Sequence, residues 1–96
     1  MKNVFHMDSN NLERIAEILR VLAHPVRLQI VYELLMKKSL KVSALQQLLK
    51  LPQSTVSQHL NKMRSHKVIA YERKGIEVHY RVDDEKIKQI LRTLIC

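Results

Sequence analysis

The stretch that decides the fold is LPQSTVSQHLNKMRSHKVI, residues 51–69. On a helical wheel of about 100° per residue, Leu60 and Met63 fall within about 40° of Val56, which predicts the buried face of a helix over about 53–66. The opposite side carries only short polar groups and one cation: Ser54, Gln58, Asn61 and Ser65, flanked by Thr55, Ser57 and Lys62. Side chains of this kind at a helix N-terminus can hydrogen-bond base edges and phosphates; the alternative is an ordinary surface helix.

The residues before this stretch predict three more helices. Apolar residues at positions 42, 45, 48 and 49 predict a short helix that ends at Leu51-Pro52, with Ser39 or Ser43 near its start. Because so few residues separate it from the next helix, the pair has the outline of a helix-turn-helix. Further upstream, apolar spacing predicts helices over 9–23, with Ser9 or Asn10 as N-cap, and over 25–37, opened by a proline.

The residues after it change period. Apolar residues at 69, 71, 76, 78, 80 and 82 alternate with polar ones and predict a two-stranded hairpin over 68–82. Gly75 would be the second residue of a Lys74-Gly75 loop, which places Glu72 opposite Glu77. A last helix is predicted over about 84–95, where the acidic run 83–85 favours the helix dipole.

The net charge of +8 is unevenly distributed. No acidic residue occurs between Glu33 and Glu72, whereas this interval contains Lys37, Lys38, Lys41, Lys50, Lys62, Arg64 and Lys67. A surface of one sign attracts polyanions, either nucleic acid or an acidic membrane face, unless it is only a solvated lysine-rich surface.

Composition excludes several classes of protein. Ninety-six residues are expected to form one domain over 1–96. A single glycine cannot supply a P-loop or a dinucleotide-binding loop, and a single cysteine excludes an intramolecular disulfide framework. The sequence contains no apolar run of membrane-span length and no signal peptide, so we expect a cytoplasmic protein without a membrane partner.

Three segments together resemble the ArsR/SmtB family of bacterial winged-helix repressors. They are LAHPVRLQIVYELL (22–35), LPQSTVSQHLNKMRSHKVI (51–69) and ERKGIEVHYRV (72–82), and the likeness covers about residues 12–95. STVSQHL (54–60) is the most specific part, and LPQSTVSQHL is similar to a subgroup that lacks metal. The resemblance implies a mainly α winged helix-turn-helix with about five helices and one two-stranded hairpin. It also implies a homodimeric repressor on a palindromic DNA operator, nucleoid-associated when bound.

The resemblance carries DNA contacts onto two elements. On the fourth helix these are Gln53, Ser54, Thr55, Ser57, Gln58 and His59, and on the wing they are Arg73 and Lys74. Lys62 is expected to contact the DNA backbone because it is a long cation beside this face. A buried, hydrogen-bonded imidazole is the alternative for His59, which lies about 60° from the apolar centre of the helix. Pro52 departs from the serine frequent in the family, so the usual side-chain N-cap is lost.

The first and last helices carry more apolar surface than one small core needs. The resemblance places a dimer interface on them, and the apolar stripes supply its candidates: Leu12, Ile15, Leu19, Ile87, Ile90, Leu91 and Leu94. The alternative is that both helices only cover their own domain. On the first interpretation, a charged residue in place of Leu91 should abolish the dimer and DNA binding together.

A metal cofactor is not expected. The positions that match the family's Cys-x-Cys box are Lys41 and Ser43, and no histidine follows the acidic run at 83–85. The five histidines at 6, 24, 59, 66 and 79 have no paired spacing, although a site shared across a dimer stays open. Cys96 could act as a thiol sensor, but a lone cytosolic cysteine is normally reduced.

An enzyme is the weakest interpretation, because no nucleophile, base and oxyanion loop can be assembled, and no small-molecule substrate is evident. The main rival is a winged-helix module that binds RNA or a protein. Only four aromatic residues are present to stack on single strands, and no additional apolar patch is evident. The sequence therefore predicts a repressor that binds double-stranded DNA without a metal cofactor.

Overall fold

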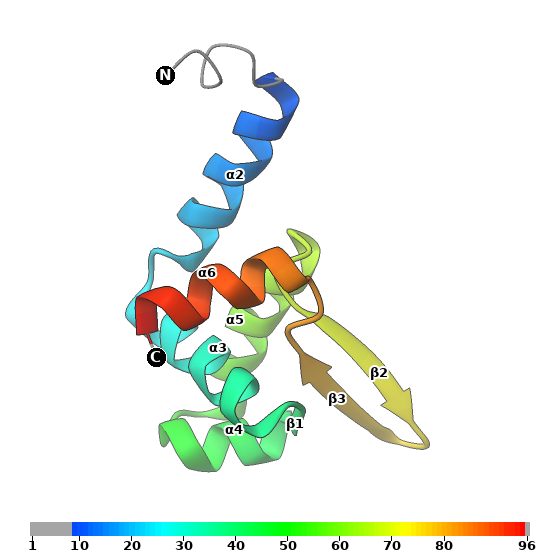
Figure 1. Cartoon of the computed structure of the whole chain (residues 1–96). Helices are drawn as coiled ribbons and strands as arrows, with labels where there is room; N and C mark the ends of the chain where they lie inside the picture. The colour runs from blue at the N-terminus through cyan, green and yellow to red at the C-terminus, as the bar shows by residue number, and fades with distance from the viewer. Residues whose placement is uncertain (1–8, 96) are drawn as a thin grey trace.

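The computed structural model describes residues 9–95. Its five helices are α2 (Ser9–Leu22), α3 (Pro25–Lys37), α4 (Val42–Leu49), α5 (Gln53–Ser65) and α6 (Glu85–Ile95). The strands are β1 (Leu40–Lys41), β2 (Ala70–Lys74) and β3 (Glu77–Arg81) (Figure 1). The mainly α winged helix-turn-helix predicted from the sequence is confirmed. A third short strand was not predicted.

The helix boundaries follow local sequence signals. Pro25 opens α3, and the His24 side chain caps it, with Nδ1 accepting a hydrogen bond from the Val26 N–H at 3.2 Å. Lys50 ends α4 in the left-handed conformation, and its N–H bonds the Gln46 carbonyl at 2.9 Å. Pro52 is the N-cap of α5 and supplies no side-chain cap, as predicted.

The starts of the other helices differ in their caps. The N-cap of α4 is Lys41, without a side-chain hydrogen bond, and Ser39 and Ser43 lie near the start of this helix, as expected. Ser9 and Asn10, the N-cap candidates for the first helix, both lie inside α2. At α6, Asp84 Oδ1 accepts hydrogen bonds from the Lys86 N–H at 2.8 Å and the Ile87 N–H at 3.1 Å.

One hydrophobic core joins all the helices to the base of the hairpin. Its buried side chains are Val21, Leu22, Ile30, Val31, Leu34, Leu45, Val56, Leu60, Met63, Val68, Ile69, Tyr80, Val82, Ile87 and Leu91. The three apolar residues predicted for the inner face of α5 are all among them. Dense packing against this face holds α5 in one rotational setting, so its polar side faces outward.

The hairpin register differs from the prediction by one residue in each strand. The two-residue loop is Gly75-Ile76, Lys74 pairs with Glu77, and Glu72 pairs with His79. Gly75 has φ +66° and comes first in the loop, as in a type II′ turn, so its lack of a Cβ is used there. The correction removes the unfavourable Glu72–Glu77 pair and places Ile76, expected on the apolar face, at the loop with 96% exposure.

The additional strand β1 makes the sheet three-stranded, in the order β1-β3-β2. Leu40 pairs with Tyr80 and Lys41 with His79, both antiparallel. A two-residue strand is too short to show an alternating pattern, so no signal in the sequence predicts it. Its pairing attaches the start of α4 to the root of the wing.

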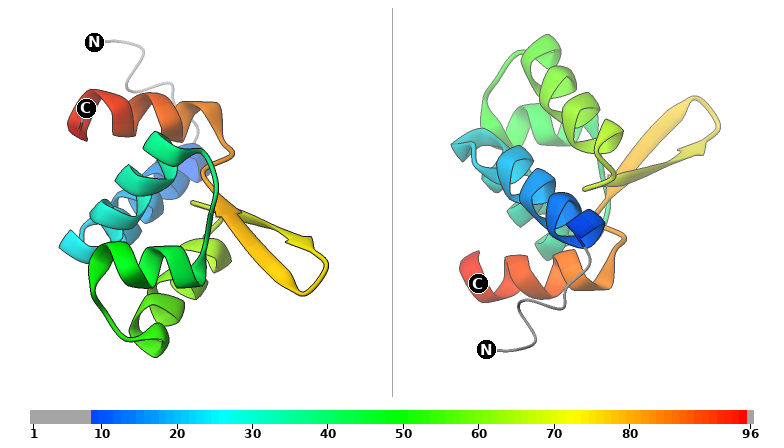
Figure 2. Two further views of the ribbon diagram at one scale, coloured as in Figure 1. Left: turned by 90° about the horizontal axis from the view of Figure 1, so that it is seen from below. Right: turned by 90° about the horizontal axis from the view of Figure 1, so that it is seen from above.

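The helices α6 and α5 lie on different sides of the protein. Figure 2 shows α6 on one side of α3 and the α4–α5 pair on the other, and α3 packs against all three of these helices. The hairpin of β2 and β3 projects away from the helical body in every view (Figures 1 and 2). A partner on α6 would therefore leave α5 and the wing accessible.

Candidate nucleic-acid interface

The outer face of α5 is built from the side chains that the core leaves outside. Gln53, Ser54, Gln58 and Lys62 are exposed, while Thr55 and Ser57 are half-buried. The first turn of α5 contains no acidic residue, and its N-terminal amides carry the positive end of the helix dipole. The face therefore presents hydrogen-bonding groups in a positive field, without a carboxylate to repel phosphate.

The wing carries two unpaired cations. Arg73 and Lys74 are exposed in β2, and neither has an ion-pair partner among residues 9–95. Glu77, the acid opposite Lys74, is engaged elsewhere: its carboxylate lies 2.9 Å from Lys41 Nζ and 3.3 Å from His79 Nε2. The hydrogen bond from Lys41 lowers the pKa of Glu77 most, and the hydrogen bond with His79 lowers it further. Both wing cations are thus available to a polyanion.

His59 points into the protein rather than away from it. Its Nδ1 accepts a hydrogen bond from Arg27 Nε at 3.2 Å, and its ring meets the His24 ring edge-on at 4.6 Å between centroids. Burial lowers the pKa of His59, and the nearby His24 and Arg27 lower it further. This is the hydrogen-bonded alternative considered above, and it attaches α5 to the start of α3. Contact between His59 and DNA stays a prediction.

His59 should make stability depend on pH. A folded-state pKa below about 6.5 means that the unfolded chain binds the proton more readily, so the stabilisation is complete above about pH 6.5 and is lost as the pH falls below it. His59→Asn keeps an acceptor near the Nδ1 position but cannot be protonated. We expect the free energy of unfolding, measured with urea, to fall less between about pH 7.5 and about pH 5.5 in this variant than in the wild type. Equal losses in both proteins would contradict the prediction.

A second network, which the sequence did not reveal, attaches α5 to α2. Arg14 donates hydrogen bonds to the carbonyls of His66 and Lys67, just beyond the end of α5. Glu17 lies 3.1 Å from His66 Nδ1, and that contact lowers the pKa of Glu17. The i, i+3 spacing of Arg14 and Glu17 is typical of an ion pair on one helix. Their contacts with residues 66 and 67 leave no signal in the sequence, because those residues are about fifty positions away.

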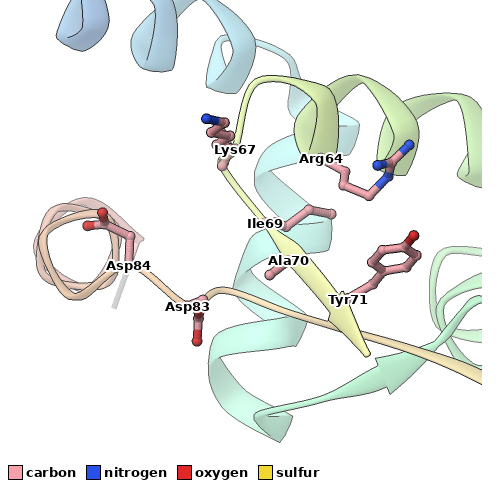
Figure 3. Close-up of a pocket in the computed structure, with 8 residues that line it drawn as sticks. Arg64, Lys67, Ile69, Ala70, Tyr71, Asp83 and Asp84 are labelled. Carbon is pink, nitrogen blue, oxygen red and sulfur yellow. The ribbon is translucent and has the colours of Figure 1, made fainter. Parts of the chain in front are cut away.

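An open cleft of about 420 Å³ lies between the end of α5, the start of β2 and the segment before α6 (Figure 3). At its side the Arg64 guanidinium lies 5.2 Å from the centre of the Tyr71 ring, a cation–π contact that joins α5 to the wing. Asp83 and Asp84 line the cleft as well, but Asp83 is paired with Arg81, and Asp84 caps α6. Both carboxylates therefore have structural partners.

The candidate dimer residues fall into two groups. Ile87 and Leu91 are buried in the protomer's own core, so they are not available for direct contact with a second protomer. Leu12, Ile15 and Leu19 on α2, with Ile90 and Leu94 on α6, stay exposed, and Leu94 reaches 66%. Large apolar side chains repeated along one face of two helices are unusual for a surface exposed to water.

Residues 9–95 contain no group of three or more His, Cys, Asp or Glu side chains that could hold a metal ion. His6 and Cys96 lie outside the described residues, so the structure does not bear on their proposed sensing roles. Within the same range, no helix has both the length and the hydropathy of a membrane span.

A helix-turn-helix followed by a β-hairpin, with a polar and acid-free outer face on its second helix, defines the winged-helix class of nucleic-acid-binding proteins. A family model described as bacterial regulatory protein, arsR family, matches residues 24–70. The chain belongs to this family of bacterial regulatory proteins and is not an enzyme.

Two relatives and two solved structures support this membership. The transcriptional repressor PagR of Bacillus anthracis is 50% identical over 84 residues, which cover 88% of this chain and 84% of PagR. The repressor SmtB of Mycobacterium tuberculosis is 41% identical over 83% of this chain, but the match spans only 58% of SmtB. The PagR crystal structure superposes with a TM-score of 0.86 at 47% identity, covering 91% of this chain and 99% of that one. HlyU from Vibrio cholerae gives a TM-score of 0.84 at 30% identity, with coverages of 92% and 94%.

Proposed function

We propose that this chain, as a single domain over 1–96, is a transcriptional repressor that binds a palindromic DNA operator as a homodimer in the bacterial cytoplasm, associated with the nucleoid. The observation that carries the proposal is the outer face of α5, which offers amides and hydroxyls and no carboxylate. Beside it lies a wing on which Arg73 and Lys74 have no ion-pair partner within the described residues. The names of PagR and SmtB, both repressors, support it.

Each element has its own part in this proposal. The N-terminal half of α5 enters the major groove, where Gln58 contacts a base edge and Gln53, Ser54, Thr55 and Ser57 contact bases or phosphates. Lys62, Arg73 and Lys74 are long cations and bind phosphates without reading sequence. The exposed stripes of α2 and α6 join two protomers, so that two α5 helices meet half-sites about one helical turn apart.

Selection of bound fragments from a random library of duplex DNA tests the proposal and gives the operator. We expect an inverted repeat to be enriched over random sequence by at least ~10³-fold. Equal binding of operator and random duplex would instead favour an architectural or RNA-directed role.

Two substitutions separate base readout from charge. Gln58→Ala should remove a base contact worth about 1–3 kcal/mol from each half-site and relax the preference at one position there, because the substitution is present in both protomers. Lys74→Ala should weaken operator and random duplex alike. It should also reduce the slope of log affinity against log salt concentration by about 0.9 for each phosphate that is no longer neutralised. Fluorescence anisotropy with the selected operator and a scrambled duplex measures both.

The matched control is Gln47→Ala, an exposed glutamine on α4, the other helix of the helix-turn-helix. It should change the base preference less than Gln58→Ala. If Gln58→Ala lowers the affinity for every sequence equally, α5 does not read bases through this residue.

A further inference from the structure

On the α6 side of α3, away from α5, a cleft of about 290 Å³ lies between the end of α3, the end of β3 and α6. Its apolar floor is formed by Leu34 and Val82, both buried, and by the half-buried Leu35. The volume is near the lower limit of the roughly 300–1,000 Å³ typical of small-molecule sites. A short apolar chain that lies on this floor therefore has part of its surface removed from water, which favours binding.

The rim of the cleft is strongly positive. Lys38, Arg81, Lys88 and Arg92 line it, and among the described residues Asp83 is the one acid that lines it with them. Arg81 is paired with Asp83 at 3.3 Å, and Lys88 with Glu85 at 3.3 Å. Neither Lys38 nor Arg92 has an acidic partner within the part of the chain that the structure describes. Two cations are thus left over at the edge of an apolar floor.

The position of Lys38 is fixed by an unusual backbone turn. Its φ of 70° and ψ of −45° lie in a region that residues other than glycine rarely adopt, and the Ser39 N–H bonds the Lys37 carbonyl across it at 2.8 Å. This tight turn ends α3 and places the Lys38 residue at the rim of the cleft. One unpaired cation therefore comes from the end of α3 and the other from α6.

We propose that this cleft binds a small amphiphilic organic anion, with a carboxylate or phosphate head at Lys38 and Arg92 and a short apolar tail on Leu34, Leu35 and Val82. Charge-assisted hydrogen bonds to Arg and Lys hold the head, and apolar contact selects against simple inorganic anions. The cleft contains Arg81 and Val82, at the segment that joins the wing to α6. An occupied cleft therefore changes how the wing is held, and the ligand acts as an effector of DNA binding; this last step rests on the proposed function.

The test uses the full chain labelled with ¹⁵N and titrated with octanoate as the probe. We expect saturable shifts of the backbone amides of Leu35, Lys38, Val82 and Arg92. Octan-1-ol, which has the tail without the charge, and inorganic phosphate, which has the charge without the tail, should each bind at least tenfold more weakly. Absence of saturable shifts at these amides, or phosphate binding as tight as octanoate, would overturn the proposal.

Variants identify the cations. The double variant Lys38→Gln/Arg92→Gln should lose at least tenfold in octanoate affinity, whereas Lys86→Gln, an exposed cation on α6 outside the cleft, should not. Equal octanoate affinity in the two variants would show that Lys38 and Arg92 do not bind the head group. Saturating octanoate should change operator affinity in the wild type and not in the double variant. An unchanged affinity would refute the effector role, whereas failure of the DNA-binding proposal would appear as no operator binding at any octanoate concentration.

Discussion

Replacing Leu94 by glutamate is expected to give a folded monomer that binds the operator at least about 100-fold more weakly than the wild type. Leu94 is 66% exposed in the protomer, so the charge does not disturb the core. In a symmetric dimer the same substitution occurs on both sides of the interface and buries two carboxylates against apolar surface. A monomer also loses the effective-concentration gain of binding two half-sites at once, which is about 10²–10⁴-fold.

Light scattering gives the oligomeric state, circular dichroism the folding and fluorescence anisotropy the operator affinity. Leu48→Glu is the matched control for the oligomeric state, because Leu48 is an exposed leucine on α4, on the opposite side of α3 from α6. It should remain dimeric. A wild type that is monomeric at micromolar concentration, or a Leu94→Glu variant that still dimerises, would refute the symmetric arrangement.

Leu91→Ala should destabilise the fold by about 2–5 kcal/mol, because it removes a side chain with no exposed surface and leaves a cavity between α6 and α3. This is a large fraction of the roughly 5–15 kcal/mol that stabilises a typical domain. Urea unfolding at one fixed protein concentration measures the loss, since the stability of a dimer depends on concentration. Ile76→Ala, at the exposed tip of the wing, is the control and should change stability by less than about 0.5 kcal/mol.

A loss below about 1 kcal/mol for Leu91→Ala would mean that α6 is not part of the protomer's core. The burial of Leu91 also changes the experiment that the sequence suggested. A charged residue at this position would unfold the protomer and so could not report on dimerisation. Leu94 and Ile90 are the positions that separate the two effects.

The helices and the outer face of α5 could be predicted because their signals are local. Val56, Leu60 and Met63 recur at the helical period, and all three are fully buried. Pro25 and Pro52 mark helix starts through their fixed φ and missing N–H, without reference to the rest of the chain. The family resemblance, carried mainly by the residues of α5 and the wing, is confirmed by the match to the arsR family model and to PagR.

What depends on partners distant in sequence could not be predicted in this way. The one-residue shift of the wing loop follows from the pairing of Lys74 with Glu77 across the two strands, and the strand β1 from pairing with residues about forty positions away. The hydrogen bond from Arg27 to His59 has the same origin: the sequence left the role of His59 open because the hydrogen-bond partner lies on another helix.

The apolar stripe of α6 shows the division most clearly. The sequence determined that Ile87, Ile90, Leu91 and Leu94 share one side of a helix, because that follows from 3.6 residues per turn. Only the tertiary structure decided that Ile87 and Leu91 fill the protomer's core while Ile90 and Leu94 remain exposed. The physical reason is that burial is equally favourable against any apolar surface, so a stripe alone does not specify what covers it. The packing of α3 against α6 makes that choice.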